Sequence, residues 1–322
     1  MSAVKRILAV IDPDKKEQPA FSRALCFDNG QPLEIILLSC LCYPSIESTY
    51  ILDPENITQV KDAMIKQHHN KMLTLVHECK LKAAKIELEV IWRDSVHIGI
   101  LEMVEQYQPD LLIKSTHKHS AVTRWFFNSV DKQLLRACPT PLLFVKQHEW
   151  PENATIMAAI DPGHRLNKQG ELDKRILTLA HGIAQQLNLP LHACHCFDPS
   201  YWEILFKAVG VAEIWTDVFP ANPDVNDHRV LDDLRELHSK KFNQDCQDTV
   251  PNSENRHLIE GSVDEVIPTL VLEQKVAIVV LSTEHRTGLL ESTAEDILEA
   301  VECDVLAIKP AGFESPFTDR LR

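Results

Sequence analysis

The sequence predicts an α/β protein built from two tandem domains with parallel sheets, and two internal repeats carry this prediction. The apolar run Ile7–Pro13 returns as Ile156–Pro162, 149 positions later, and each copy ends in Asp-Pro. A second repeat relates residues 95–116 to residues 262–283, and both copies end in Ser-Thr. Short apolar runs bounded by turn residues are typical of buried parallel strands. We therefore expect two similar domains, each with a five-stranded parallel sheet between helices.

The first half alternates strands and helices in the order that a parallel sheet requires. Its strands are apolar runs of three to ten residues, and its helices show apolar residues three and four positions apart. The first strand runs to Asp12, and the later strands are predicted at residues 33–42, 86–92, 111–113 and 142–146. The helices are predicted at residues 19–26, 55–82, 96–107 and 122–136.

The second half keeps this order but has a longer interval between its second and third strands, at about residues 198–255. A polar joint at residues 147–155, which contains Pro151, separates domain 1 (1–149) from domain 2 (150–322). The interval ends in a helix predicted at residues 227–246. Its aromatic residues either extend the core or line an apolar cavity. They are Tyr201, Trp202, Phe206, Trp215 and Phe219.

Composition excludes several classes of partner. The net charge of −14 argues against a protein that neutralises nucleic-acid phosphates. No apolar stretch is long enough to span a bilayer, and the N-terminus lacks a signal-peptide pattern, so a cytoplasmic location without a membrane partner is expected. The nine cysteines include no CxxC pair and are expected to be reduced core residues.

Polar residues follow the first and fourth predicted strands of each half. Asp12 and Asp161 end the first strands, and the segments Ser115–His119 and Ser282–Arg286 follow the fourth strands. In open parallel sheets, ligands bind beyond the carboxyl ends of the strands, where the strand order reverses. We therefore expect these residues to meet at one ligand site in each domain.

At these positions the chain resembles the universal stress protein family. The family pattern is an aspartate after the first strand, a loop G-x2-G-x9-G-[ST] after the fourth strand, and then a helix. The resemblance covers almost the whole chain as two domains in tandem, and the segment Gly261–Pro268 is one of its most specific parts. It implies a flavodoxin-like fold, in which ATP is often bound, and roles in survival under growth arrest and under DNA-damaging or oxidative stress.

The resemblance also implies how the two domains are joined. Universal stress domains usually dimerise through their last strands, which here would pair residues 142–146 with residues 305–309. Such pairing removes an exposed sheet edge. The tandem chain would then resemble a covalently linked dimer with pseudo-two-fold symmetry, and a further homodimer remains open.

The glycines of the family's nucleotide loop are replaced in both domains. Such a loop brings backbone N–H groups close to phosphate, which side chains obstruct, and each lost charge-assisted hydrogen bond costs about 1.5–3 kcal/mol. Glu291 adds repulsion in the second, shorter loop, whereas Lys118 offers a compensating charge in the first. ATP is therefore disfavoured in both domains, more so in domain 2, and the cofactor stays undetermined. The candidate ligand-binding residues are Asp12, Ser115, Lys118, Asn128, Ser129, Asp161, Ser282, His285 and Ser292.

The sequence favours neither metal binding nor catalysis. The segment His192–Cys196 is the densest group of potential metal ligands. In a strand, however, His195 would face away from the other three, so buried core positions are the preferred interpretation and no metal is expected. Ser129 has no nucleophile-elbow glycines around it, and no triad spacing is present.

Three functional hypotheses follow. The leading one is a non-catalytic cytoplasmic stress protein that acts by binding a small ligand or a protein partner. The second is an ATP-binding protein with slow ATPase activity, which would use Asp12, Ser115, Lys118 and Asn128–Ser129. The third is a binder of an apolar or acylated small molecule in a domain 2 cavity.

Overall fold

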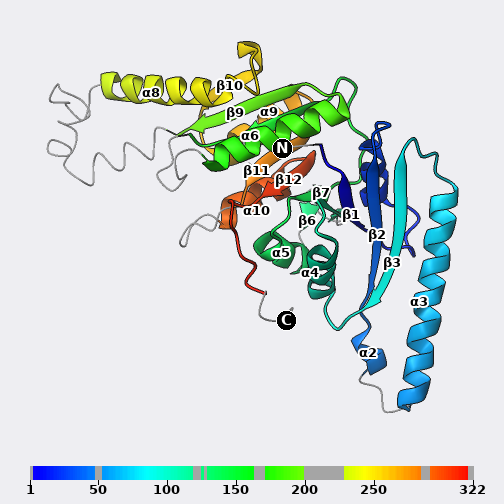
Figure 1. Cartoon of the computed structure of the whole chain (residues 1–322). Helices are drawn as coiled ribbons and strands as arrows, with labels where there is room; N and C mark the ends of the chain where they lie inside the picture. The colour runs from blue at the N-terminus through cyan, green and yellow to red at the C-terminus, as the bar shows by residue number, and fades with distance from the viewer. Residues whose placement is uncertain are drawn as a thin grey trace.

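All the main strands form one continuous sheet in the computed structural model, which describes residues 3–47, 53–118, 125–126, 129–162, 171–198, 228–283 and 291–317. This ten-stranded sheet has the order β10-β9-β8-β11-β12-β7-β4-β1-β2-β3 (Figure 1). Within each half, the third, second, first, fourth and fifth strands lie side by side and run parallel. The predicted α/β fold with tandem parallel sheets is thereby confirmed.

The elements of the first half agree with the predicted order. They are β1 (Arg6–Val10), α1 (Pro19–Cys26), β2 (Leu33–Leu41), α2 (Pro44–Glu47), α3 (Pro54–His77), β3 (Ala84–Trp92), α4 (Val96–Tyr107), β4 (Leu111–Ser115), β5 (His117–Lys118), β6 (Trp125–Phe126), α5 (Ser129–Ala137) and β7 (Leu142–Val145).

The second half repeats this order. Its elements are β8 (Thr155–Ala159), α6 (Glu171–Leu187), β9 (Leu191–Phe197), α8 (His228–Cys246), a short 3-10 helix (Ser253–Asn255), β10 (Arg256–Glu260), α9 (Val263–Glu273), β11 (Val276–Ser282), α10 (Glu291–Ala300) and β12 (Asp304–Ile308). The aromatic residues between β9 and α8 lie outside the described part of the chain.

The two halves join through their last strands. β7 and β12 pair antiparallel, with Leu143 beside Leu306, which confirms the predicted pairing. A buried carboxylate reinforces this junction: Asp304 accepts hydrogen bonds from the Lys146 backbone N–H at 2.9 Å and from Trp150 Nε1 at 3.0 Å. Arg23 Nε lies 2.5 Å from the same carboxylate. The junction is therefore held by β-sheet hydrogen bonds and by a charged cluster.

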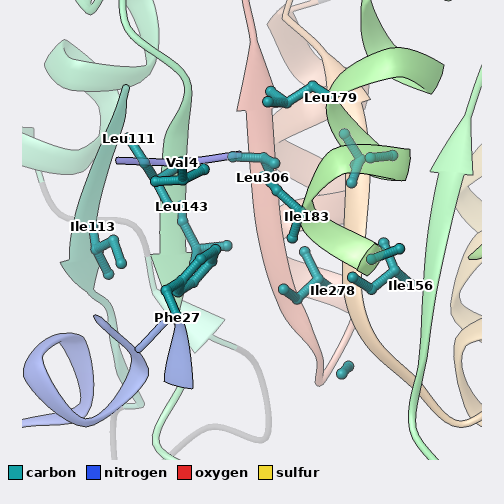
Figure 2. Packing of buried hydrophobic residues seen from close by; sticks show 14 of the residues in the cluster. Val4, Phe27, Leu111, Ile113, Leu143, Ile156, Leu179, Ile183, Ile278 and Leu306 are labelled. Atoms are coloured by element: carbon teal, nitrogen blue, oxygen red, sulfur yellow. The ribbon is translucent and has the colours of Figure 1, made fainter. Parts of the chain in front are cut away.

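Each face of the sheet carries one apolar core that extends through both halves. Side chains alternate along a strand, so Ile35 and Leu37 enter one core while Ile36 and Leu38 enter the other. Residues of α1, α3, α6 and α8 complete the first core, and residues of α4, α5, α9 and α10 complete the second. Figure 2 shows the first core, in which residues of β4, β7, β8, β11, β12 and α6 pack together.

Two helix predictions need correction. The helix expected at 122–136 begins only at Ser129, because Trp125–Phe126 instead form β6, which pairs antiparallel with β5. The helix expected to end at residue 82 ends at His77. The carboxylate of Asp28 accepts the backbone N–H groups of Lys82 and Ala83 at 2.6 and 3.0 Å, which directs the chain out of the helix and into β3.

The sequence similarity of Ser39–Tyr43 to Ala193–Phe197 predicts that these segments of the two second strands correspond, but the strand pairing is two residues out of that register. Val10 of β1 lies beside Leu38, whereas Ala159, its counterpart in the repeat, lies beside Cys194. Cys194 therefore corresponds to Leu38 and not to Cys40. Because two residues make one full strand period, the error preserves the face of each side chain but shifts its position along the strand.

Candidate functional site

A cavity of about 530 Å³ lies beyond the carboxyl ends of β1, β2 and β4 in domain 1. β1 pairs with β2 on one side and with β4 on the other, so the strand order reverses there. Asp12, which follows β1, and Ser115, which ends β4, both line the cavity. The structure thus brings two of the predicted residues together at the expected place.

Charged residues of both signs surround the mouth of the cavity. Asp12 accepts a hydrogen bond from the backbone N–H of Asp14 at 3.1 Å, and Lys15 Nζ lies 3.9 Å from its other carboxylate oxygen. Lys16 and Glu17 also line the cavity. The loop between β1 and α1 therefore offers both hydrogen-bond acceptors and cations to a ligand.

Two buried residues of the cavity wall, Ser39 and His68, are linked to the exposed carboxylate of Asp14. His68 of α3 has its Nδ1 atom 3.2 Å from Ser39 Oγ and its Nε2 atom 3.4 Å from an Asp14 carboxylate oxygen. Lys71 contacts the other oxygen of Asp14, and this hydrogen bond lowers the pKa of the carboxyl group. The His68 ring therefore joins the Ser39 hydroxyl to the Asp14 carboxylate.

Lys114, on the β4 side of the cavity, is already neutralised. Its Nζ atom donates to Asp131 at 2.6 Å and to the Ser115 carbonyl oxygen at 3.2 Å. Both side chains of this ion pair are buried. The charge of Lys114 therefore stabilises the end of β4, and Lys15 and Lys16 of the β1–α1 loop are the other described lysines that line the cavity.

The remaining candidate residues of domain 1 are only partly placed. Ser129 is the exposed first residue of α5, and the backbone of Lys118 belongs to β5. The side chain of Lys118 and the whole of Asn128 lie outside the described part of the structure. Sequence reasoning missed Ser39 and His68. One feature of the sequence could have indicated His68: it is a polar residue on the side of α3 that faces the sheet.

In domain 2, histidines occupy the place that Ser39 and His68 have in domain 1. By strand register, His195 of β9 corresponds to Ser39, and its Nε2 atom lies 2.8 Å from Nδ1 of His238 on α8. The two rings stack with centroids 5.1 Å apart. Burial lowers the pKa of His195 to about 4, against the opposing effect of the Asp161 charge. His238 thus contacts the second strand from α8 much as His68 does from α3.

Of the other candidate residues of domain 2, Asp161 lies near this histidine pair, and the rest are only partly described. Asp161 follows β8 and donates its backbone N–H to the Asp173 carboxylate at 3.2 Å. Ser282 ends β11, and Ser292 belongs to α10, although its side chain is not described. His285 lies outside the described residues.

The segment His192–Cys196 separates into two faces, as its strand geometry predicts. His192 Nδ1 lies 2.9 Å from His257 Nε2, while His195 contacts His238 on α8. Cys194 and Cys196 have their sulfur atoms 3.9 Å apart. Within the described ranges, no group of three or more potential ligands is arranged to hold a metal ion.

Comparison with known proteins defines the class of this chain. The sequence model of the Universal stress protein family matches residues 3–146 and 154–309. The chain therefore belongs to the universal stress protein family, with two family domains in tandem. A solved universal stress protein structure from Pseudomonas aeruginosa UCBPP-PA14 has the same fold, with a TM-score of 0.68, 22% identity, and coverage of 96% of this chain and 94% of that chain.

Within the family, the chain is similar to Universal stress protein E. It is 28% identical over 322 residues to that protein of Photorhabdus laumondii, and the match covers 98% of each chain. It is 27% identical over 321 residues to that of Escherichia coli K12, covering 98% of this chain and 97% of the relative. These matches confirm the family resemblance. Among the helices that the structure describes, none is long and apolar enough to cross a membrane.

Proposed function

We propose that this protein is a cytoplasmic stress-response protein that acts by binding a small molecule in the domain 1 cavity, without catalysing its conversion. The observation that carries the proposal is the 530 Å³ cavity at the reversal point of the sheet. Its volume falls within the range of small-molecule sites, roughly 300–1,000 Å³. It combines an apolar wall, which includes Val10 and Ile11, with the polar groups of Asp12, Ser39 and Ser115.

The chemistry of the cavity favours binding over turnover. Ser39, His68 and Asp14 are linked as in a nucleophilic triad, but Ser39 lies within β2, which pairs with strands on both sides. The backbone N–H groups there serve the sheet, so they are not available to stabilise an oxyanion. The linked side chains instead present a fixed hydroxyl to a bound molecule.

ATP is the second candidate ligand. Lys15 and Lys16 at the cavity mouth support it, because ammonium groups bind phosphate as point charges. The replaced loop glycines and the neutralised Lys114 weigh against it. The third hypothesis, an apolar ligand in domain 2, depends on residues 199–227 outside the described structure and stays a prediction.

Mass spectrometry of small molecules released from freshly purified protein tests the proposal. We expect a stoichiometric ligand in the unmodified protein and its loss in Asp12→Ala, because Asp12 lines the cavity. Asp62→Ala, an exposed carboxylate on α3, is the matched control and should retain the ligand. An equally loaded Asp12→Ala protein would contradict the proposed site.

Nucleotide is tested separately by thermal unfolding with and without ATP and Mg²⁺. A shift in melting temperature that Asp12→Ala abolishes would identify ATP as the ligand. Phosphate release above the background of the Asp12→Ala protein would then overturn the non-catalytic part of the proposal. If no small molecule co-purifies and ATP produces no shift, the cavity is not the functional site.

A further inference from the structure

A second cavity, of about 450 Å³, lies at the opposite end of the domain 2 sheet, where β9 begins. We call it the amide groove. One wall is the end of α6 and the turn after it, from His181 to Leu191, and the other wall is the segment Thr249–Asn255 between α8 and β10. It is separate from the carboxyl edge, where Asp161 and His195 lie.

The backbone fixes both walls of the amide groove. Asn188 ends α6 in the left-handed conformation, with φ +55°, and the Leu189 N–H donates to the Ala184 carbonyl oxygen at 2.9 Å. On the other wall, the Val250 N–H donates to the Cys246 carbonyl oxygen at 2.8 Å. Ala184 and Val250 are both buried in the core. The groove is thus formed by the fold itself.

Among the described residues that line the amide groove there is no aspartate, glutamate, lysine or arginine, although a quarter of the residues in the chain are charged. Its polar groups are carboxamides, one hydroxyl and one imidazole. His181 Nδ1 donates to the Thr249 carbonyl oxygen at 3.1 Å, which sets Nε2 as the acceptor of the neutral ring. The groups are His181, Gln185, Asn188, Thr249, Asn252 and Asn255.

Domain 1 closes the corresponding place. Asp28 is the second residue after α1 and Asn188 is the first residue after α6, and each donates its backbone N–H to the carbonyl oxygen three residues before it. The buried Asp28 carboxylate binds the backbone of Lys82 and Ala83, so it ties the end of α1 directly to the segment that precedes β3. After α6 in domain 2, Asn188 is instead exposed on the wall of the groove.

We propose that the amide groove binds a neutral polyhydroxylated small molecule, of the size of a monosaccharide or disaccharide. None of the described residues that line the groove is an acid, a lysine or an arginine, so the lining offers no opposite charge to a phosphate, a carboxylate or a metal ion. The neighbouring Arg256 guanidinium is already bound to the carbonyl oxygens of Val250 and Pro251. Carboxamides present a donor and an acceptor side by side, which match neighbouring hydroxyl groups. Leu189, Pro190 and Pro251 offer apolar contacts to the C–H face of a sugar ring.

The test is a titration of the full chain with a panel of neutral monosaccharides and disaccharides. Binding is measured by isothermal calorimetry and by the NMR signals of the Asn and Gln side-chain amides. Sugar phosphates and amino sugars of matched size serve as charged probes. We expect at least one neutral sugar to bind saturably and to shift the signals of Gln185 and Asn252. Each charged analogue should bind more weakly there, because it lacks a compensating group.

Two isosteric variants localise the binding. Asn252→Asp keeps the oxygen that accepts the Glu254 N–H at 3.1 Å but loses the NH₂ donor. Gln185→Glu likewise replaces the NH₂ donor of a groove residue on α6 by an oxygen. Each should weaken sugar binding by about tenfold, while Gln67→Glu, an exposed position on α3, should not. Thermal unfolding checks that all three variants remain folded.

Three results would overturn the proposal. One is the absence of saturable binding for every neutral sugar up to about 10 mM, a concentration that detects even weak sites. Another is equal affinity in the unmodified protein and both groove variants. The third is preferential binding of a sugar phosphate at Gln185 and Asn252.

Discussion

His195, at the residue scale, shows how burial sets the charge state of a side chain. Its Nδ1 atom lies 3.2 Å from the Ile160 carbonyl oxygen, and a carbonyl oxygen can only accept, so Nδ1 carries the hydrogen. In the neutral ring, Nε2 then accepts from His238. Phe242 packs against the same ring, and the carboxylate of Asp161 is the nearby opposing charge.

This geometry predicts that the folded protein loses stability in acid. Burial lowers the pKa of His195 to about 4 in the folded protein, against about 6.5 in the unfolded chain. The folded state therefore gains stability from neutral His195 above pH 6.5 and loses it as the pH falls from about 6.5 to about 4, by on the order of 3 kcal/mol in total. Urea unfolding of the unmodified protein and of His195→Gln across this range measures the difference.

The groups that face His195 must be accounted for in that comparison. Burial lowers the pKa of both His195 and His238, and the charge of Asp161 after β8 opposes this shift in both. Asp173 of α6 binds the backbone of Asp161. If His195→Gln loses stability with the same pH dependence as the unmodified protein, the titration belongs to other groups and the prediction is wrong.

Gly99 of α4 gives a second prediction at this scale. A Cβ atom at this position would lie 2.9 Å from Cys40 Sγ and 3.0 Å from Arg93 Cγ. Alanine normally stabilises a helix relative to glycine by about 1 kcal/mol. Here the steric overlap should outweigh that gain, so Gly99→Ala should lower the free energy of unfolding by about 1–2 kcal/mol. Denaturant titration monitored by circular dichroism provides the measurement.

Cys40→Ala supplies the control, because it removes the atom nearest to the added methyl group. The double variant should lose less stability than the sum of the two single variants. A Gly99→Ala protein more stable than the unmodified one would show that α4 can shift away from β2 at little cost.

At the element scale, the ion pair between Lys114 and Asp131 joins the end of β4 to α5. Lys114 Nζ lies 2.6 Å from Asp131 Oδ1, and Asp131 is fully buried. Asp131→Asn leaves the buried ammonium group uncompensated and should cost about 3–5 kcal/mol of unfolding free energy. Thermal and urea unfolding of the single variant measure this loss.

A paired apolar replacement separates the charge effect from packing. Lys114→Met with Asp131→Leu removes both buried charges and should recover most of the stability. If the double variant is as unstable as Asp131→Asn, the loss comes from repacking around α5 and not from an unpaired charge.

The predictability of these elements depends on the range of the contacts that define them. β1 and β4 are short apolar runs, so their place in the sheet, and the meeting of Asp12 and Ser115 at one cavity, follow from local pattern. His68 lies on a long helix, and its contact with Ser39 depends on how α3 packs over the sheet. No local pattern encodes that angle.

The loop after β4 shows a different limit. Amphipathic spacing alone extends α5 back to residue 122, but Trp125–Phe126 find strand partners in β5. Short aromatic pairs favour either structure, and the partner decides between them. The two-residue error in matching β2 with β9 has the same origin. The Cys-x-Cys sequences of the two segments can be aligned in two registers, and only pairing with the neighbouring strand selects one of them.

At the scale of the whole molecule, the junction between the halves is pseudo-symmetric in its strands but not in its charges. Leu143 of β7 pairs with Leu306 of β12, and these residues match in the two repeats. Asp304, which binds Arg23 and the backbone of Lys146, has Pro141 as its counterpart in domain 1. One carboxylate therefore holds only one side of the junction.

This asymmetry predicts how domain 1 behaves by itself. A fragment of residues 1–150 exposes the edge of β7, whose unpaired backbone groups favour strand pairing. We expect it to form a homodimer about Leu143, measured by light scattering and sedimentation over a range of concentrations. That dimer should be weak, because Pro141 stands where Asp304 would accept the Lys146 N–H and pair with Arg23.

Pro141→Asp in the same fragment should therefore tighten the homodimer by at least about tenfold, since each copy gains a carboxylate for the buried Arg23 and Lys146 groups of the other. Pro141→Asn, which is of the same size but uncharged, is the matched control and should have a smaller effect. Equal dimerisation of the three fragments would show that β7 pairing alone joins the halves. A monomeric Pro141→Asp fragment would show instead that the junction depends on the covalent link between the domains.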